Sequence, residues 1–553
     1  MMSQPATAVL FVPYEAAQME LFIMVAQALR LSGNTVPIIY CPYALPGERE
    51  YRRRCIEAGI EYLQEHTAEG GEVDLQRLLD ILANRYSEPL AQVLPNFRPA
   101  DLESSKQLKG HVNLQEALRI WSQLSKKRAA IRKVLQEWCT HLPPEILGTI
   151  LEDFRLWMQR YQRKLQFGRE LARRMRLGAI ILGEHIAERD SGVWLRVAAE
   201  NGLVAIVLAQ HIISKRATFD TYIENPEYWV SNAANAIFLR YFPRWRFDIG
   251  PSGLVRLPAP MALAQEWWGV ALSSPWDANG VPCNGVWVES RWLADQYIRE
   301  GVGADCISVT GSPHLDKLFV AIASPIYGPK SEIWHELGID KSRPLIVVAL
   351  PSNLYPQRRS EIAKTYEDLI LCYVQALRAL KHVSYICALH PSTGEHVIRL
   401  LKSLNVTYVL GKLAEVLPHA RLYLCSASST ISWALACGIP VINFDVYQLH
   451  HQVGEPIHGV HTIQTVEELI RWLEIIDFHF APGSSAVPNQ KLSDLEHCAR
   501  KHAAYYGQVD GRCTERILAG IYELMRRRMP VCVNRQLDVR ELRECSELLR
   551  SLG

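Results

Sequence analysis

The sequence predicts an α/β protein made of two doubly wound, Rossmann-like parallel-sheet domains, with a helical insertion in the first domain. Residues 7–43 alternate between an apolar strand, an amphipathic helix and a second apolar strand. Two later apolar strands end at polar turns, at His390-Pro391 and at Ser428-Ser429-Thr430, with helical sequence between them. This alternation is typical of parallel sheets whose strands are joined by helices.

Length and composition set the scale of the molecule. With 553 residues the chain exceeds what one hydrophobic core usually spans, so we expect two domains with elaborations. Hydrophobic residues make up 48% and charged residues 21%, which is typical of a globular protein. The formal net charge of +2 is too small to indicate nucleic acid as a partner.

Cysteine spacing and the amino terminus indicate the compartment. The thirteen cysteines are scattered without Cys-x-x-Cys pairs, so we expect free thiols in a reducing cytosol and no metal site. The apolar stretch near the amino terminus is only about six residues long and follows no basic segment. No run reaches the roughly 18 apolar residues of a membrane span. The expected location is cytoplasmic, with contact at the inner face of the membrane left open.

The first domain opens at residue 7 and is interrupted early. Its first strand ends at Pro13, Tyr14 and Glu15, where parallel sheets commonly hold ligand-binding groups, although an inert loop is the alternative. Residues 73–177 are predicted as a helical insertion. Its basic residues fit a solvated helix face, or else contact with an anionic membrane or an acidic acceptor: Lys126, Lys127, Arg128, Arg132 and Lys133.

The sheet resumes after the insertion with two strands that end in polar residues. One ends at Gly183-Glu184-His185 and the next at Gln210-His211. A carboxylate and two imidazoles at one sheet edge suit the removal of a proton from a hydroxyl group near pH 7. The structural alternative is that Glu184 and His185 cap a helix and His211 makes a buried hydrogen bond.

Two further segments complete the first domain. Residues 218–280 are too long for a plain connection and are expected to form a partly ordered insertion near the cleft. The next strand ends at Gly311-Ser312, where glycine allows a backbone to approach a ligand closely. We place the domains at 1–320 and 329–520, with helices of 521–553 returning to the first domain.

The two polar turns of the second domain predict a phosphate site. An imidazole at His390 and hydroxyls at Ser428, Ser429 and Thr430 follow parallel strands, and a helix is expected from Thr430 to Cys437. The N–H groups that begin such a helix favour a phosphate. Ordinary turn and helix-capping roles are the structural alternative.

The order of these motifs resembles the GT-B glycosyltransferases that build bacterial surface polysaccharides. NGLVAIVLAQH resembles the end of their first domain, VTGSPHLDKL their interdomain segment, and ALHPS with SASSTISWALACGIPVIN their His-Pro and Ser-Ser motifs. Such motifs recur in capsule Kdo and sialic-acid-type transferases and in teichoic-acid glycerophosphotransferases. The similarity covers most of residues 178–520.

The resemblance implies a function for these residues. In those families the His-Pro histidine and the paired serines hold the nucleotide phosphate, which here implies His390, Pro391, Ser428, Ser429 and Thr430, with Gly311 and Ser312 nearby. The acidic base of the sialyl-type enzymes matches Glu184 most nearly, with His185 and His211 as competitors because Gly183-Glu184-His185 departs from the family pattern.

The implied reaction transfers a sugar from a nucleotide donor to an acceptor hydroxyl. A CMP-linked nonulosonic or Kdo-type acid is the expected donor, and a glycan, glycolipid or protein is the expected acceptor. No Asp-x-Asp pair suggests a metal-bridged diphosphate, so we expect a metal-independent reaction without a cofactor.

Two rival functions remain open at this stage. UDP-GlcNAc 2-epimerases share the expected architecture, but they carry a pair of glutamates where this chain has Ser432 and Trp433. The other rival is a non-catalytic scaffold in a glycan-assembly complex, which need not bind a nucleotide.

Overall fold

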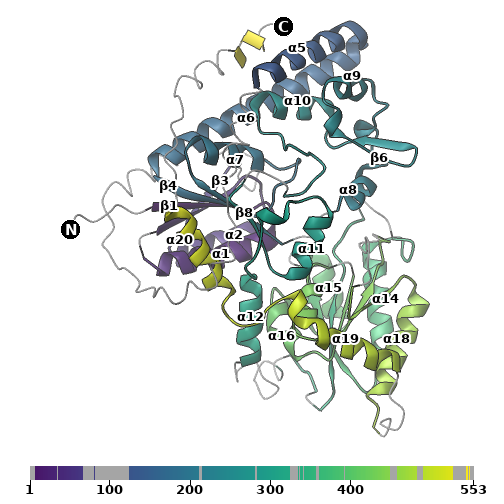
Figure 1. Ribbon diagram of the computed structural model, residues 1–553. Helices are drawn as coiled ribbons and strands as arrows, with labels where there is room; N and C mark the ends of the chain where they lie inside the picture. Colours follow the sequence, from purple (N-terminus) through teal and green to yellow (C-terminus); the bar gives the residue numbers. More distant parts are fainter. Residues whose placement is uncertain are drawn as a thin grey trace, which may run out of the picture.

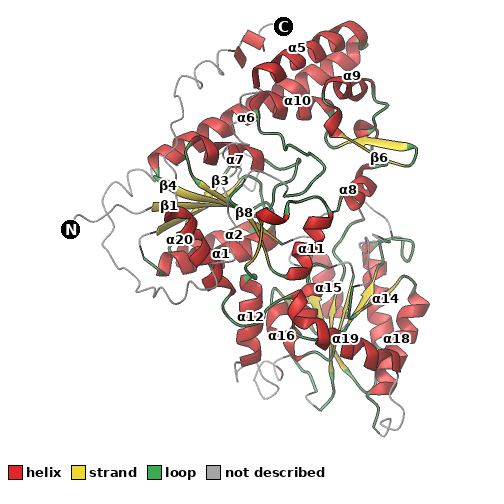
Figure 2. Ribbon diagram, in the orientation of Figure 1, coloured by secondary structure: helices red, strands yellow, loops and turns green. Residues whose placement is uncertain are grey.

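The computed structural model describes a part of the chain that holds two parallel sheets. The described residues are 7–33, 35–45, 47–65, 80, 124–210, 214–279, 283–323, 334, 337–340, 342–355, 360–390, 393–426, 428–448, 457–482, 490–526, 544–545 and 547–548. Figure 1 shows one sheet in the half of the molecule near the amino terminus and the other below it, with helices around both. Figure 2 shows that helices flank each sheet. The predicted α/β class with two Rossmann-like domains is confirmed.

The first sheet has seven parallel strands. Its order is β3 (Glu61–Gln64), β2 (Thr35–Cys41), β1 (Thr7–Val12), β4 (Leu177–Leu182), β5 (Val204–Ala209), β8 (Gly285–Val288) and β9 (Ile307–Val309). Its connecting helices include α1 (Ala16–Leu31), α2 (Glu48–Glu57), α7 (Ser191–Glu200) and α11 (Arg291–Arg299). The central strands β4 and β5 are buried along their whole length. Continuous apolar strands of this kind require helices on both faces of a parallel sheet.

The second sheet has six parallel strands. Its order is β12 (Tyr408–Leu410), β11 (Ser384–Leu389), β10 (Leu345–Ala349), β13 (Leu422–Cys425), β14 (Val441–Phe444) and β15 (Val460–Ile463). The helices and 3-10 turn of this domain are α14 (Tyr366–Leu377), α15 (Glu395–Ser403), α16 (Leu413–Val416), η5 (Leu417–His419), α17 (Ile431–Ala436), α18 (Val466–His479) and α19 (Gln490–Tyr506). In both sheets the chain runs outward over three strands and then returns to the other side of the first one.

A helical layer is built from two separate chain segments. The predicted insertion supplies α5 (Leu124–His141) and α6 (Pro144–Arg174). The aromatic-rich stretch supplies α8 (Lys215–Tyr222), η2 (Pro226–Tyr228), α9 (Ala233–Tyr241), η3 (Pro243–Trp245), the antiparallel hairpin β6 (Arg246–Ile249) and β7 (Ser252–Val255), and α10 (Ala259–Trp268). Helix α10 packs along α5 and α6, and Figure 1 shows these helices grouped at the top of the molecule.

The basic residues of α5 do not all form a solvated face. Arg128 is buried, lies over the Trp267 ring at 5.0 Å from its centroid and pairs with Glu544. Lys127 pairs at 3.0 Å with the buried carboxylate of Glu266. The prediction of a solvated face is wrong for these two residues, because α10 and the carboxyl-terminal segment cover them. Within the described helices, none combines the length and the apolar character needed to cross a membrane.

The two domains are joined by helices that cross between them. Helix α12 (Pro313–Ala323), which follows η4 (Ala304–Cys306) and β9, packs on α16 and η5 of the second domain. The last long helix, α20 (Cys513–Arg526), returns to the first domain and lies against α1, α12, β4 and β5 (Figure 1). Asp316 of α12 accepts hydrogen bonds from the backbone N–H groups of Cys513 and Thr514 at 2.8 and 2.7 Å. It thereby caps the first turn of α20.

Gly311 lies where this joint is tightest. Its φ angle of 82° is in the left-handed region, and a Cβ atom there would approach Cys513 Cβ to 2.9 Å and Arg516 Nη2 to 3.0 Å. The neighbouring Ser312 is buried, and its hydroxyl accepts from the His314 N–H at 3.4 Å. The glycine allows close approach, as the sequence analysis expected, but the group that approaches it is α20.

Replacing Gly311 with alanine tests this packing. We expect Gly311→Ala to lower the free energy of unfolding by about 2–4 kcal/mol, because the left-handed backbone costs about 1 kcal/mol and overpacking about 1–3 kcal/mol more. Gly411→Ala is the matched control, since Gly411 also has a positive φ of 70° but open space around it. Urea unfolding measures both. Equal losses in the two variants would contradict the close packing at Gly311.

Candidate functional site

The turns after β1 and β4 lie side by side where the first sheet reverses its strand order. The two strands pair in parallel, with Val12 opposite Leu182 near their carboxyl ends. Such a switch point opens a crevice between neighbouring strand ends, and open α/β sheets bind their ligands there. The first turn carries Tyr14 and Glu15, and the second carries Glu184.

A buried glutamine connects these two turns. Gln18 Oε1 accepts a hydrogen bond from the Tyr14 backbone N–H at 2.7 Å. The Gln18 side chain lies so close to Gly183 that any side chain at position 183 would overlap it. The glycine before Glu184 therefore provides the space that Gln18 needs to hold the turn after β1.

Arg189 links the two carboxylates at the strand ends. Its Nε atom lies 3.1 Å from Glu184 Oε1, and its Nη2 atom lies 3.2 Å from Glu15 Oε1. The guanidinium also lies over the rings of Tyr14 and Tyr43, 5.9 and 5.7 Å from their centroids. The Glu184 side chain is 4% exposed and that of Glu15 is 41% exposed. A ligand in the crevice therefore meets Glu15 more readily than Glu184.

A second set of charges lies next to Arg189, around the buried Asp190. Its carboxylate pairs with Lys164 and, at 3.4 Å, with Arg160, and it accepts a hydrogen bond from the Tyr43 hydroxyl at 3.1 Å. Burial acts to raise the pKa of Asp190, but the two cations outweigh burial and the pKa is lowered. Lys164 also lies 3.0 Å from Glu65, so the cluster joins the interior of α6 to the end of β3 and the start of α7.

His185 faces the protein interior. Its ring Nδ1 lies 2.5 Å from the Ser191 hydroxyl oxygen, and its backbone forms hydrogen bonds with Asn279 in both directions. Burial lowers the pKa of His185 to about 3, so its imidazole is neutral near pH 7. A buried, weakly basic histidine is poorly suited to the role of base that the sequence analysis left open for it.

The matching edge of the second sheet carries the predicted phosphate-binding residues. His390 directly follows β11, and Ser428, Ser429 and Thr430 follow β13; both strands flank β10 at the second switch point. The hydroxyl oxygens of Ser428 and Thr430 lie 2.7 Å apart, and that of Thr430 lies 2.5 Å from the Tyr423 hydroxyl. Ser429 is exposed at the turn.

The charge of Glu15 acts on His390, although the two residues follow strands of different sheets. Burial by surrounding atoms lowers the pKa of His390, while the negative charge of Glu15 acts to raise it. Such an electrostatic effect requires the two side chains to be near each other. The end of β1 and the end of β11 are therefore close enough for a charge on one to affect the other.

The helix after the serines is shorter than predicted. It spans Ile431–Ala436, six residues, instead of Thr430 to Cys437. The expected helix N–H groups are thus a weak basis for phosphate binding, and the prediction rests on the hydroxyls and His390.

The two positions that distinguish the epimerases make contacts between the domains. The Ser432 hydroxyl donates to Glu289 Oε1 at 2.5 Å, at the end of β8. The Trp433 ring packs against His314 of α12, with 4.6 Å between ring centroids and 33° between the ring planes. Both side chains are thus directed toward the first domain.

Other predicted site residues lie elsewhere or outside the described residues. Gly311 and Ser312 belong to the joint with α20 rather than to the cluster around Glu15. His211 and Pro391 lie outside the described residues. The roles given to all of these residues stay predictions.

Sequence reasoning missed Arg189 and the charges around Asp190. Arg160 and Lys164 are four residues apart on α6, a spacing that places them on one helix face, but it equally suits a solvated face. Arg189 and Asp190 follow Glu184 within one loop, and that density of charge after a buried strand was a usable signal.

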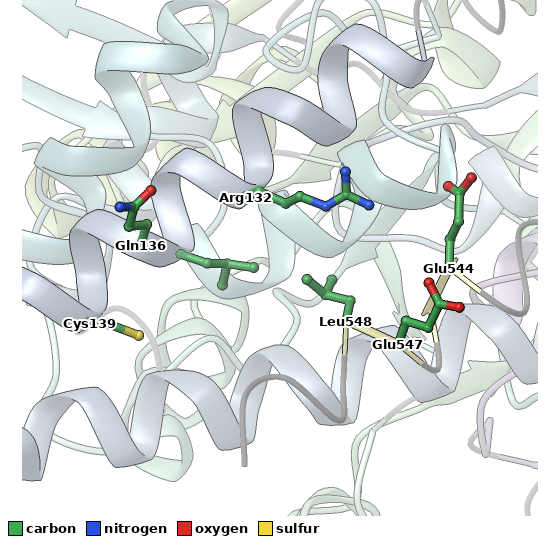
Figure 3. Close-up of a pocket in the computed structure, with 7 residues that line it drawn as sticks. Arg132, Gln136, Cys139, Glu544, Glu547 and Leu548 are labelled. Atoms are coloured by element: carbon green, nitrogen blue, oxygen red, sulfur yellow. The ribbon is translucent and has the colours of Figure 1, made fainter.

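A separate pocket lies on the helical layer. It has a volume of about 330 Å³ between α5 and the segment 544–548, and its lining includes Arg132, Cys139, Glu544 and Leu548 (Figure 3). It lies away from both sets of strand ends, so we do not assign it to the candidate site.

Comparison with known proteins gives distant structural likenesses. No protein-family model matches the chain, and no curated protein matches its sequence. The UDP-GlcNAc 2-epimerase of Neisseria meningitidis bound to UDP-GlcNAc is 11% identical over 94% of this chain and all of its own, with a TM-score of 0.45. A glycosyltransferase of Rickettsia africae is 10% identical over 95% of this chain and 100% of its own, with a TM-score of 0.40. Anabaena Alr3699/HepE in complex with UDP is 11% identical over 94% of this chain and 100% of its own, also with a TM-score of 0.40. These scores are too low to argue function.

The ion pairs of Arg189 are expected to stabilise the fold measurably. Arg189→Gln removes a cation from the buried Glu184 carboxylate, and we expect a loss of about 2 kcal/mol in the free energy of unfolding, less than for a fully buried pair because Arg189 is partly exposed. Adding Glu184→Gln should recover more than half of the loss.

The control for this pair is Arg53→Gln, which removes exposed ion pairs to Glu50 and Glu57 and should cost less than about 1 kcal/mol. Urea unfolding of the wild type, Arg189→Gln, Glu184→Gln, the double variant and Arg53→Gln gives the comparison. Purely additive losses at positions 184 and 189 would show that the pair has no coupling energy.

Proposed function

We propose that the protein is a nucleotide-sugar-dependent glycosyltransferase whose reaction takes place between the two sheet edges. The observation that carries the proposal is that the charge of Glu15 acts on the pKa of His390, although each residue follows a strand of a different parallel sheet. Such edges bind ligands in open α/β sheets, and a cleft bordered by two of them can hold a donor on one side and an acceptor on the other.

The second domain is the side proposed for the donor. Hydroxyl groups at Ser428, Ser429 and Thr430 can donate hydrogen bonds to phosphate oxygens. His390 lies at the end of β11, on the other side of β10 from these hydroxyls. When protonated, it adds a charge-assisted hydrogen bond, which is stronger than a neutral one.

The first domain is the side proposed for the acceptor. A general base must reach the acceptor hydroxyl, and Glu15 is far more exposed than Glu184. We therefore assign the base to Glu15 and give Glu184 the task of orienting Arg189. The sequence-based choice of Glu184 as the base is the alternative.

In the proposed reaction the acceptor oxygen attacks the anomeric carbon of the donor sugar. The acceptor proton passes to the Glu15 carboxylate as the new carbon–oxygen bond forms. The bond between the sugar and the nucleotide phosphate breaks, and its electron pair leaves with the phosphate. His390 and the three hydroxyls stabilise the charge that develops on that phosphate, a role that requires donors already in position. We propose no metal ion or cofactor for this step.

A CMP-linked nonulosonic or Kdo-type acid is the donor we propose, on the resemblance of the His-Pro and Ser-Ser motifs. A UDP-sugar is the alternative, since UDP-GlcNAc is bound in one of the compared structures and UDP in another. A 2-epimerase is less well supported. Ser432 and Trp433 stand where the epimerases carry carboxylates, and both side chains contact the first domain instead. The third candidate is a scaffold without nucleotide binding.

We further propose that the acceptor is a glycan, glycolipid or protein used in surface-glycan synthesis. The protein would act in the cytoplasm. The exposed Lys126, Arg132 and Lys133 of α5 are the groups that would touch an anionic membrane there.

Nucleotide binding tests the donor side directly. We expect one of CMP, CDP, UMP and UDP to raise the melting temperature of the wild-type protein, with a stabilisation near 2.7 kcal/mol at about 100 times its Kd. His390→Ala should weaken that ligand at least about tenfold, whereas His396→Ala, which changes an exposed histidine on α15, should not. A cytidine-selective shift supports the CMP-linked donor and a uridine-selective shift the UDP-sugar. No shift with any of the four would favour the scaffold.

The base assignment needs a separate measurement of turnover. With the donor identified by binding, Glu15→Gln should lower the rate of sugar transfer by about 100-fold or more and leave nucleotide affinity within about twofold. Glu184→Gln should change the rate less. The opposite order would return the base to Glu184.

The pH dependence of binding tests His390. A bound phosphate favours the protonated imidazole, so the pKa of His390 should be higher in the complex than in the free protein, where it is lowered. Nucleotide affinity should therefore increase as the pH falls through the pKa of the complex, and level off below that of the free protein. The His390→Gln variant should keep only the pH dependence of affinity that comes from ionisation of the nucleotide phosphate. Identical pH profiles would exclude protonation of His390 on binding.

A further inference from the structure

Three potential metal ligands gather on the second domain, away from the strand ends of the candidate site. They are His458, in the turn before β15, and Cys498 and His502, both on α19. One donor atom from each residue can be chosen such that all three lie within 4.8 Å of one another. The rings of His458 and His502 are nearly parallel, with 4.3 Å between their centroids.

The backbone on both sides of this cluster is well fixed. Cys498 and His502 are four residues apart on one helix, so they project from the same face. His458 precedes Gly459, where a Cβ atom would approach Ala499 Cα to 2.8 Å and Leu435 Cδ2 of α17 to 2.9 Å. The Gly459 carbonyl oxygen also accepts from the Val441 N–H at 2.9 Å. The turn thus lies directly against α19 beside Cys498.

We propose that His458, Cys498 and His502 form a binding site for a zinc ion. Thiolate and imidazole are the ligands that Zn²⁺ prefers, whereas Mg²⁺ and Ca²⁺ prefer oxygen. A water molecule would occupy the fourth position of the tetrahedron. The Cys498 thiol releases its proton to solvent when the sulfur–zinc bond forms.

The geometry requires the side chains to rotate, because the nearly parallel rings of His458 and His502 must turn to direct a nitrogen from each at one ion. Zinc–nitrogen bonds of about 2.0 Å and a zinc–sulfur bond of about 2.3 Å place tetrahedral ligands about 3.3–3.6 Å apart. The three donors are within 4.8 Å and need to close by about 1 Å. All three side chains have some exposure to solvent, so rotation about their χ angles is not blocked by a packed core.

The bound ion would connect the start of β15 to α19. Helix α19 packs against α17 and also reaches α11 of the first domain. Tyr505 on the same helix donates to Asp295 of α11 at 2.8 Å. Zinc would therefore stabilise the part of the second domain that contacts the first. The lack of Cys-x-x-Cys pairs predicted no metal site, but these three ligands come from two separate elements and follow no such spacing.

The test uses the full-length protein after removal of metal with a chelator. We expect one equivalent of Zn²⁺ to bind in competition with a chromophoric chelator and to raise the melting temperature. Co²⁺ as a spectroscopic substitute should give visible bands of a tetrahedral site and a near-ultraviolet thiolate-to-cobalt band. Cys498→Ser and His458→Ala should each lower zinc affinity at least about 100-fold, since even loss of an outer hydrogen-bond partner of a zinc ligand costs about 10- to 100-fold.

His497→Ala is the matched control, because His497 is exposed and adjacent to Cys498 on α19 but is not part of the cluster. It should bind zinc as the wild type does. Circular dichroism establishes that each variant is folded, and His458→Ala changes no residue of the helix. The proposal is overturned if the wild type binds no zinc, if Cys498→Ser retains its affinity, or if the cobalt complex lacks the thiolate band. Nucleotide binding can succeed or fail independently of these results.

Discussion

The proposed cleft depends on the joint that fixes the two sheets relative to each other. Glu15 and His390 belong to different sheets, so their relative position is set by the contacts of α12, α17 and α20 rather than by local sequence. The joint combines tight backbone packing at Gly311 with the buried hydrogen bond between Ser432 and Glu289. Leaving such a buried polar group without its partner costs about 1–3 kcal/mol. Sliding one sheet against the other is therefore unfavourable unless a ligand compensates.

The charge balance of the first edge favours an acceptor over a phosphate. Its cluster contains four carboxylates and three cations: Glu15, Glu65, Glu184 and Asp190 with Arg160, Lys164 and Arg189. The cations are already paired with carboxylates, so a phosphate would have to displace one of those pairs and leave a carboxylate without its cation. The second edge offers hydroxyls and an imidazole instead. In the proposed function, the first edge is therefore the acceptor side and the second edge is the phosphate side.

Local pattern determined what could be predicted about the fold. The apolar runs of β1, β2 and β4 and the helical spacing of α1 were readable because a buried parallel strand and an amphipathic helix have distinct periodicities. The helical layer was only half predicted, since α10 packs on α5 and α6 from more than 80 residues away. Such long-range packing leaves no periodic signal, which is why Lys127 and Arg128 were wrongly placed on a solvated face.

For the candidate site, the positions at the strand ends could be predicted from the sequence, but the orientations of the side chains could not. Strand ends identified Glu184, His390 and the serines, because a parallel sheet brings its carboxyl ends to one edge. The orientation of a side chain at such an end is a tertiary property. His185 turns toward Ser191 and Gly311 faces Cys513, although both follow strands as Glu15 does. Arg189 lies in a loop whose course no repeating pattern describes.

The contacts of α17 are the physical basis for proposing a transferase rather than an epimerase. In an enzyme that holds its nucleotide with carboxylates from the helix after the serines, those side chains must face the ligand. Here Ser432 faces Glu289 and Trp433 faces His314, so this helix face is used for contact between the domains. The serine turn remains at the cleft with its hydroxyls, and hydroxyls suit a phosphate but provide no base or acid. Chemistry that needs a carboxylate must then obtain it from the first domain, where Glu15 and Glu184 lie. In the proposed transferase, the serine turn would hold the donor phosphate, and a carboxylate of the first domain would receive the proton of the acceptor hydroxyl.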